Sequence, residues 1–176
     1  ACGEKAETKK VKEELVIAQD GEAKSLDIHQ GNDGFSLRAN RLIYSRLVES
    51  DENMQIHPGL AESWEQIDDK TMQFHLRKGV KFHNGYDFTA EDVKFSFERM
   101  MNSPRIAFVL PPIEKIEIVD DYTVNLVTKT PFGPLLAHLS HPALGIVSKK
   151  LLTENSEALK ETPIGTGSYK FKVRAC

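Results

Sequence analysis

Residues 60–93 read LAESWEQIDDKTMQFHLRKGVKFHNGYDFTAEDV. Within this stretch, alternation with polar neighbours is typical of a strand with one buried face, and it involves Met72, Phe74 and Leu76. Lys78 and Gly79 then turn the chain. Residues 89–92 (TAED) have the form of a capping box with Asp in place of Glu, and apolar residues follow at helical spacing: Val93, Phe97 and Met100. The stretch therefore predicts a strand, a turn and a helix, in that order.

Further strands and helices are predicted on both sides of this stretch. The run 15–18 (LVIA) is short and rich in branched residues, which favours a buried strand. Apolar residues form a helical stripe over 36–49, with Ser36 as its cap. A hairpin is expected with an acidic turn at Asp120 and Asp121. Short helices are predicted over 131–139 and after Ser148, and a last strand over 169–173.

Composition excludes several classes of protein. The 176 residues are 40% hydrophobic and 28% charged, as expected for a folded globular chain. A formal net charge of -3 gives no general attraction to nucleic acid, so no nucleic-acid partner is expected. No apolar run approaches the roughly 20 residues that cross a bilayer. The two cysteines, Cys2 and Cys176, have no companions at metal-ligand or redox spacing.

Several segments, in this order, resemble the bacterial extracellular solute-binding proteins of family 5, which serve ABC importers for oligopeptides, dipeptides, nickel and related solutes. The strongest matches are LAESW at 60–64, TMQFHLRKGVKFHNG at 71–85 and FTAEDV at 88–93. Weaker matches are SLD at 25–27, HP at 141–142 followed by IVSK at 146–149, and GTGSYKF at 165–171. Ile28 and Ser168 stand where the family usually has Pro.

The resemblance implies an α/β fold of the periplasmic-binding-protein type II class, with mixed sheets and flanking helices. It further implies a fragment of that fold: residues 14–45 with 165–176 would form part of a first domain, and residues 46–164 a nearly complete second domain. Family members are far longer than this chain. The third domain, which closes on the ligand, is expected to be absent.

The N-terminus looks like the end of a lipoprotein signal. In ACG, a small residue precedes Cys2, the candidate for acylation, and the charged residues 1–13 would form a tether. The predicted location is extracytoplasmic, either in the periplasm or on the outer face of the cytoplasmic membrane. The alternative is that Cys2 is a terminal thiol with no such role.

In the family, the solute lies between the first and third domains, and an extended peptide can add to the backbone as an extra strand. The matching stretch is 19–25, which predicts ligand contacts from Glu22, Ala23, Lys24 and Ser25. Gly34, Phe35, Leu37 and Phe108 occupy positions that face the cleft in some relatives. Alternatively, 19–25 is an ordinary solvated loop, and Phe108, between Ala107 and Val109, is a core residue.

The function implied is that of the peptide-binding component of an ABC importer, with a peptide ligand and a membrane permease as partners and no cofactor. A stand-alone surface or antigen module is the alternative, and a hydrolase is a weaker one. His138 and His141 lack further ligands at metal spacing, and no phosphate loop or nucleophile elbow occurs, so no metal site and no enzyme activity are expected. Self-association through open edges of the strands at 15–18 and 169–173 is also expected.

Overall fold

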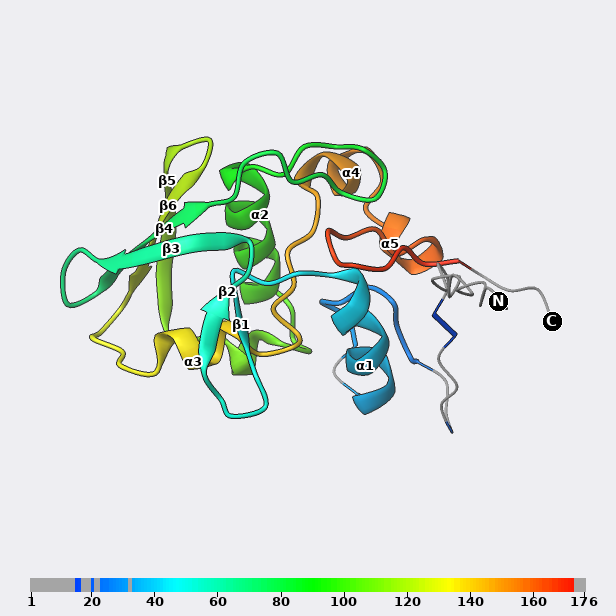
Figure 1. Ribbon diagram of the computed structural model, residues 1–176, viewed down its shortest axis with the longest axis horizontal. Helices are drawn as coiled ribbons and strands as arrows, with labels where there is room; N and C mark the ends of the chain where they lie inside the picture. The colour runs from blue at the N-terminus through cyan, green and yellow to red at the C-terminus, as the bar shows by residue number, and fades with distance from the viewer. Residues whose placement is uncertain (1–14, 17–19, 21–22, 32, 173–176) are drawn as a thin grey trace, which may run out of the picture.

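The computed structural model describes residues 15–16, 20, 23–31 and 33–172. In Figure 1 the strands of the four-stranded sheet, which covers residues 61–76 and 113–128, lie on one side of α2 (Ala90–Met101), and α1 (Gly34–Ile43), α4 (Lys149–Glu154) and α5 (Ala158–Glu161) lie on the other. The helices are α1 (Gly34–Ile43), α2 (Ala90–Met101), the 3-10 helix η1 (Ala107–Val109), α3 (Leu135–Leu139), α4 (Lys149–Glu154) and α5 (Ala158–Glu161). The strands are β1 (Val48–Ser50), β2 (Ile56–Pro58), β3 (Ala61–Gln66), β4 (Thr71–Leu76), β5 (Ile113–Asp120) and β6 (Thr123–Thr128). Among the described residues, no helix has the length and apolar composition needed to span a bilayer.

The main sheet has four antiparallel strands in the order β3-β4-β6-β5. The alternation in 72–76 places Phe74 and Leu76 on the buried face, and Phe74 pairs with Val124 of β6. The predicted hairpin is confirmed, because β5 and β6 meet at the acidic turn. Trp64 on β3 is partly buried and packs at 6.4 Å, centroid to centroid, from Phe74.

Helix α2 covers this sheet, and its predicted start is confirmed. Thr89 is the N-cap, and its amide donates to the Asp92 carboxylate at 2.9 Å. The apolar stripe of the helix is buried against the sheet: Val93, Phe97 and Met100. The predicted cap at Ser148 is also confirmed, because the Ser148 side chain accepts from the amide of Leu151 in α4.

The prediction of a helix over 36–49 is wrong at both ends. Helix α1 starts at Gly34 because Asp33, not Ser36, is the N-cap and accepts a hydrogen bond from the Ser36 amide at 3.0 Å. It ends at Ile43 because Tyr44 has extended backbone. Leu47 and Val48 are fully buried apolar residues, but Leu47 precedes β1 and Val48 begins it. Their spacing from the apolar residues of α1 fits a helix, although their backbone is not helical.

The two terminal strands are not formed in the described part of the chain. Leu15 and Val16 are 49% and 62% exposed and belong to no strand, while 17–18 lie outside the described residues. Residues 169–172 belong to no strand, and the Tyr169 amide donates to the Leu42 carbonyl at 3.2 Å. A strand needs a neighbouring strand for its backbone groups, and none lies there among the described residues. Self-association through these two segments stays a prediction.

The buried apolar residues in the described part of the chain form two clusters. The larger one fills the space between the main sheet and α2 and extends to α3. The smaller one joins segments far apart in sequence, namely Ile28, Ile43, Tyr44, Val147, Leu152 and Leu159. The GTGSYKF motif closes against this smaller cluster, where the Gly167 amide donates to the Ile43 carbonyl at 2.8 Å. The predicted domain boundaries at 45 and 165 stay a prediction.

Candidate functional site

The predicted ligand-contacting residues that the structure describes lie in residues 23–25, at the start of α1 and in η1. Glu22 lies outside the described residues. Ala23 and Ser25 are half-buried, and Lys24 is exposed. Gly34 and Phe35 begin α1 and are exposed, whereas Leu37, one turn on, packs against the larger cluster. The structure brings Ser25 onto α1, because the Ser25 amide donates to the Ser36 hydroxyl at 3.2 Å.

Both backbone groups of Ser25 are occupied. Its amide is bonded to Ser36, and its carbonyl accepts from the Asn40 side chain at 3.4 Å. Neither Ala23 nor Lys24 has a backbone hydrogen bond to another described residue. An added peptide strand could therefore pair with the backbone before Ser25, but not with Ser25 itself.

Phe108 is not a core residue. It lies in η1 with 72% of its surface exposed, so the interpretation of its apolar neighbourhood as core is wrong. The reason is the single turn of 3-10 helix, which turns Phe108 outward while Val109 packs against the larger cluster. Leu37 packs against that same cluster, and the His138 imidazole is bonded to the Val109 carbonyl at 3.1 Å. Phe108 remains a candidate ligand contact.

The sequence gives no sign of a buried polar network that joins Asp27, His29 and Arg99. Arg99 of α2 makes a two-pronged ion pair with Asp27, with Nη1–Oδ1 2.8 Å and Nη2–Oδ2 2.5 Å. Asp27 Oδ1 also accepts the His29 amide at 3.1 Å. His29 is wholly buried, and its Nε2 donates to the Gly145 carbonyl at 2.8 Å. The partners are 72 residues apart in sequence, so no local spacing indicates the pair.

Burial and charge shift the pKa values in this network. Burial, together with the Arg99 charge, lowers the pKa of His29 to about 4. For Asp27, burial acts to raise the pKa, but the hydrogen bonds and charge of Arg99 prevail and lower it. His29 is therefore neutral and Asp27 ionised at neutral pH.

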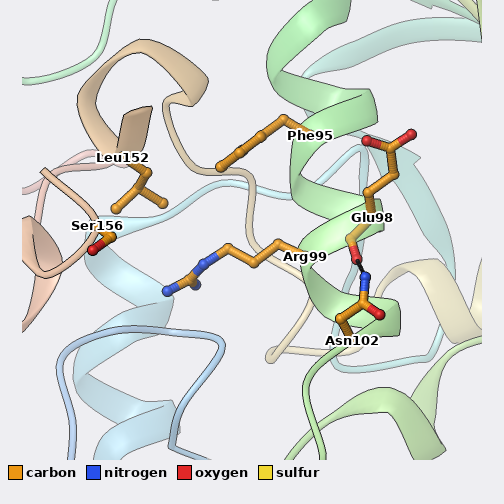
Figure 2. A pocket seen from close by; sticks show the side chains of 6 residues that line it. All are labelled: Phe95, Glu98, Arg99, Asn102, Leu152 and Ser156. Carbon is orange, nitrogen blue, oxygen red and sulfur yellow. Dashed lines mark hydrogen bonds between the residues drawn. The ribbon is translucent and has the colours of Figure 1, made fainter. Parts of the chain in front are cut away.

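A pocket of about 300 Å³ lies between α2 and the α4–α5 region, and Figure 2 shows Arg99 reaching into it from α2. Its other lining side chains are Phe95, Glu98, Asn102, Leu152 and Ser156. The Arg99 guanidinium is already engaged by Asp27, and Asn102 donates to the Glu98 carbonyl at 2.8 Å. The pocket therefore presents few uncommitted polar groups.

Each histidine of the pair considered for metal binding uses Nδ1 in a hydrogen bond to the backbone. His138 is bonded to Val109, and His141 Nδ1 accepts the Ala143 amide at 3.2 Å. Across the described part of the chain, no three His, Cys, Asp or Glu side chains gather in a way that could hold a metal ion. Cys2 and Cys176 lie outside the described residues.

Several known proteins are similar to this chain in sequence and in fold. The glutathione-binding protein GsiB of Pectobacterium atrosepticum is 35% identical over 162 residues, which are 90% of this chain and 32% of that protein. The agropinic-acid complex of AgaA from A. tumefaciens R10 has a TM-score of 0.80 at 34% identity, over 88% of this chain and 32% of that one. A third relative is the ABC transporter-associated periplasmic binding protein DppA from Helicobacter pylori, in complex with the peptide STSA. It has a TM-score of 0.74 at 34% identity, over 87% of this chain and 35% of that one.

The chain spans about a third of the length of these relatives. Their shared architecture confirms a fold of the periplasmic-binding-protein class, represented here by a fragment. The family profile described as "Bacterial extracellular solute-binding proteins, family 5 Middle" matches residues 55–174, which include the strand, turn and helix of 60–93. The chain belongs to the bacterial extracellular solute-binding proteins of family 5.

Proposed function

We propose that this chain supplies one wall of the ligand cleft of a peptide-binding protein that serves an ABC importer. The observation that supports it best is the hydrogen bond that holds Ser25 on α1, next to Ala23 and Lys24, whose backbone groups bond to no other described residue. A peptide recognised through its backbone can vary in side chain, which suits a binding protein for many sequences. Two relatives support the peptide class: GsiB is a glutathione-binding protein, and DppA forms a complex with the peptide STSA.

Two aromatic side chains suit the ligand-facing surface. Phe35 and Phe108 are 36% and 72% exposed, although most aromatic residues of such size are buried. Rigid rings give broad contact area and lose little rotamer freedom on binding. We assign them to contacts with ligand side chains, while the backbone of Ala23 and Lys24 pairs with the ligand main chain.

The remaining parts of the proposal follow from family membership. The partner is a permease of the cytoplasmic membrane, and the protein acts outside the cytoplasm by closing around its solute, not by chemistry. No cofactor is required. Acylation of Cys2 would hold the protein at the membrane surface, and the charged residues 1–13 would act as its tether.

The test uses the longest gene product that contains this chain. It is titrated calorimetrically with glutathione, the tetrapeptide Ser-Thr-Ser-Ala and agropinic acid. Phe108→Ala is expected to weaken peptide binding about tenfold. Val119→Ala, which removes an apolar side chain 54% exposed at the end of β5, is the matched control and should bind as the unmodified protein does.

Each result decides between named alternatives. Binding of agropinic acid with no peptide binding would overturn the peptide class but keep the solute-binding function. Binding of none of the three would favour a stand-alone surface module. Equal losses in Phe108→Ala and Val119→Ala would remove Phe108 from the site.

A further inference from the structure

We infer that Asp27 and Arg99 are positioning residues, which hold the ligand-facing segment 23–25 in place from α2 without contributing a ligand contact. This inference rests on the proposed function for the role of that segment. Its structural part concerns only the polar network, and can be tested without any ligand.

The ion pair is buried and directional. The side chain of Asp27 is 2% exposed and that of Arg99 20% exposed, and both oxygens of the carboxylate are gripped by the two guanidinium nitrogens. A planar guanidinium fixes a carboxylate in orientation as well as in distance. Arg99→Lys would keep the positive charge but lose the pair of parallel hydrogen bonds to the carboxylate.

The backbone of Asp27 makes hydrogen bonds that connect its fixed carboxylate to Ser25, the last residue of the ligand-facing segment. The Asp27 amide donates to the Ser25 hydroxyl at 3.1 Å, and the Gln30 amide donates to the Asp27 carbonyl at 3.0 Å. Asp27 therefore closes the turn that follows Ser25. Ser25 is in turn bonded to Ser36 and Asn40 of α1.

The same turn has anchors on other elements. The Tyr44 hydroxyl donates to the Leu26 carbonyl at 2.9 Å, and the Ser103 hydroxyl donates to the His29 carbonyl at 2.7 Å. Only Arg99 supplies a charge-assisted contact among these anchors. Residues 25–29 are therefore held by α1, by α2 and by the residues that follow these helices. The held segment ends before Lys24, whose backbone bonds to no other described residue.

Hydrogen exchange of the 176-residue chain tests the positioning role. Arg99→Gln leaves the Asp27 carboxylate buried without its cation, and is expected to speed exchange of the Asp27, His29 and Gln30 amides by about a hundredfold. Amides of β4 and β6, such as Phe74 and Leu126, should change much less. A role in global stability alone would speed all of these amides by one common factor.

Three further variants sharpen the test. Arg99→Lys should give an intermediate effect on the turn. Lys94→Gln removes a cation from the same helix, in an exposed pair with Glu98, and should leave the turn unchanged. If Arg99→Gln does not fold, the double variant Asp27→Asn/Arg99→Gln leaves no unpaired charge and should fold with a loosened turn. Unchanged exchange of the turn in folded Arg99→Gln, or in the double variant, overturns the inference, as does equal acceleration of the turn and sheet amides.

Peptide binding separates this inference from the proposed function. In the longest gene product, Arg99→Gln should weaken glutathione or Ser-Thr-Ser-Ala binding at least about tenfold, whereas Lys94→Gln should not. A loosened turn with unchanged peptide affinity would keep the positioning role but remove segment 23–25 from the ligand site. A weakened affinity with an unchanged turn would make Arg99 a direct ligand contact and overturn the inference.

Discussion

The imidazole of His29 is wholly buried beside the Asp27–Arg99 pair and has a pKa of about 4 in the folded chain, against 6.5 for a free histidine. The unfolded chain therefore binds an extra proton between these two values. The contribution of the neutral His29 to the free energy of unfolding is therefore complete above about pH 6.5 and is lost as the pH falls toward 4. Asp27, whose pKa is also lowered, adds a loss in the same direction at lower pH. Urea unfolding followed across this range should show the decline.

His29→Gln should flatten that decline, because glutamine does not titrate. His57→Gln removes an imidazole whose side chain is 56% exposed, and should keep the decline. Equal slopes for His29→Gln and the unmodified chain would show that other groups cause the acid sensitivity.

Gly165 allows a backbone contact that no side chain permits. A Cβ at this position would lie 2.2 Å from the Ile43 carbonyl oxygen and 2.9 Å from its carbon, and backbone atoms cannot move aside cheaply. Gly165→Ala should lower the free energy of unfolding by roughly 1–3 kcal/mol in a denaturant titration. Gly133→Ala, with nothing within 4 Å, is the control. A loss no larger than the control's would mean that the GTGSYKF motif does not depend on this close approach.

Acylation of Cys2 is a prediction from the sequence alone, because Cys2 lies outside the described residues. With a lipoprotein signal peptide in front of it in a bacterial host, the chain should partition into detergent. Cys2→Ser should release it to the aqueous phase, since a single acylated cysteine carries the anchor. Partitioning that is the same in both forms would contradict acylation, and Cys176→Ser controls for the loss of a thiol.

At the scale of elements, Asp92 joins two helices. Its carboxylate accepts the Thr89 amide at 2.9 Å and the Lys149 amide at 2.8 Å, so it serves the starts of α2 and α4 together. Asp92→Ala should lower the free energy of unfolding by about 1–3 kcal/mol, because two amides lose their acceptor. Glu91→Ala removes only an exposed ion pair with Lys149 and should cost less than about 1 kcal/mol. Matching losses for the two variants would contradict a joint cap.

Elements with strong local signals could be predicted from sequence, and those that depend on distant neighbours could not. The alternation around Phe74 and the capping box at Thr89 are local, and both predictions are confirmed. The end of α1 is not local: Leu47 and Val48 continue a helical spacing but are buried as extended chain beside β2. The terminal segments have strand-like patterns, yet no strand lies beside them among the described residues.

The candidate site was predictable only in part, for the same reason. The resemblance located 23–25, Phe35, Leu37 and Phe108, and the structure gives these residues exposure and neighbours without testing their contacts with a ligand. The exposure of Phe108 contradicts its apolar sequence context, because a single 3-10 turn decides which way the ring points. The Asp27–Arg99 pair crosses 72 residues, and only the assembled fold reveals it.

At the scale of the whole molecule, the chain spans about a third of its relatives, so it offers a ligand at most part of the surface that those proteins provide. Removing the opposing wall of a cleft takes away much of the buried contact, whereas the entropic cost of fixing the ligand falls far less. If the whole protein binds peptide at about micromolar strength, a loss of about 4 kcal/mol moves the dissociation constant to about millimolar. Calorimetry on the monodisperse 176-residue chain with glutathione and Ser-Thr-Ser-Ala should therefore detect no micromolar binding. Micromolar binding by the isolated chain would show that residues 23–172 hold a complete peptide site, in which segment 23–25, Phe35 and Phe108 would need no second wall.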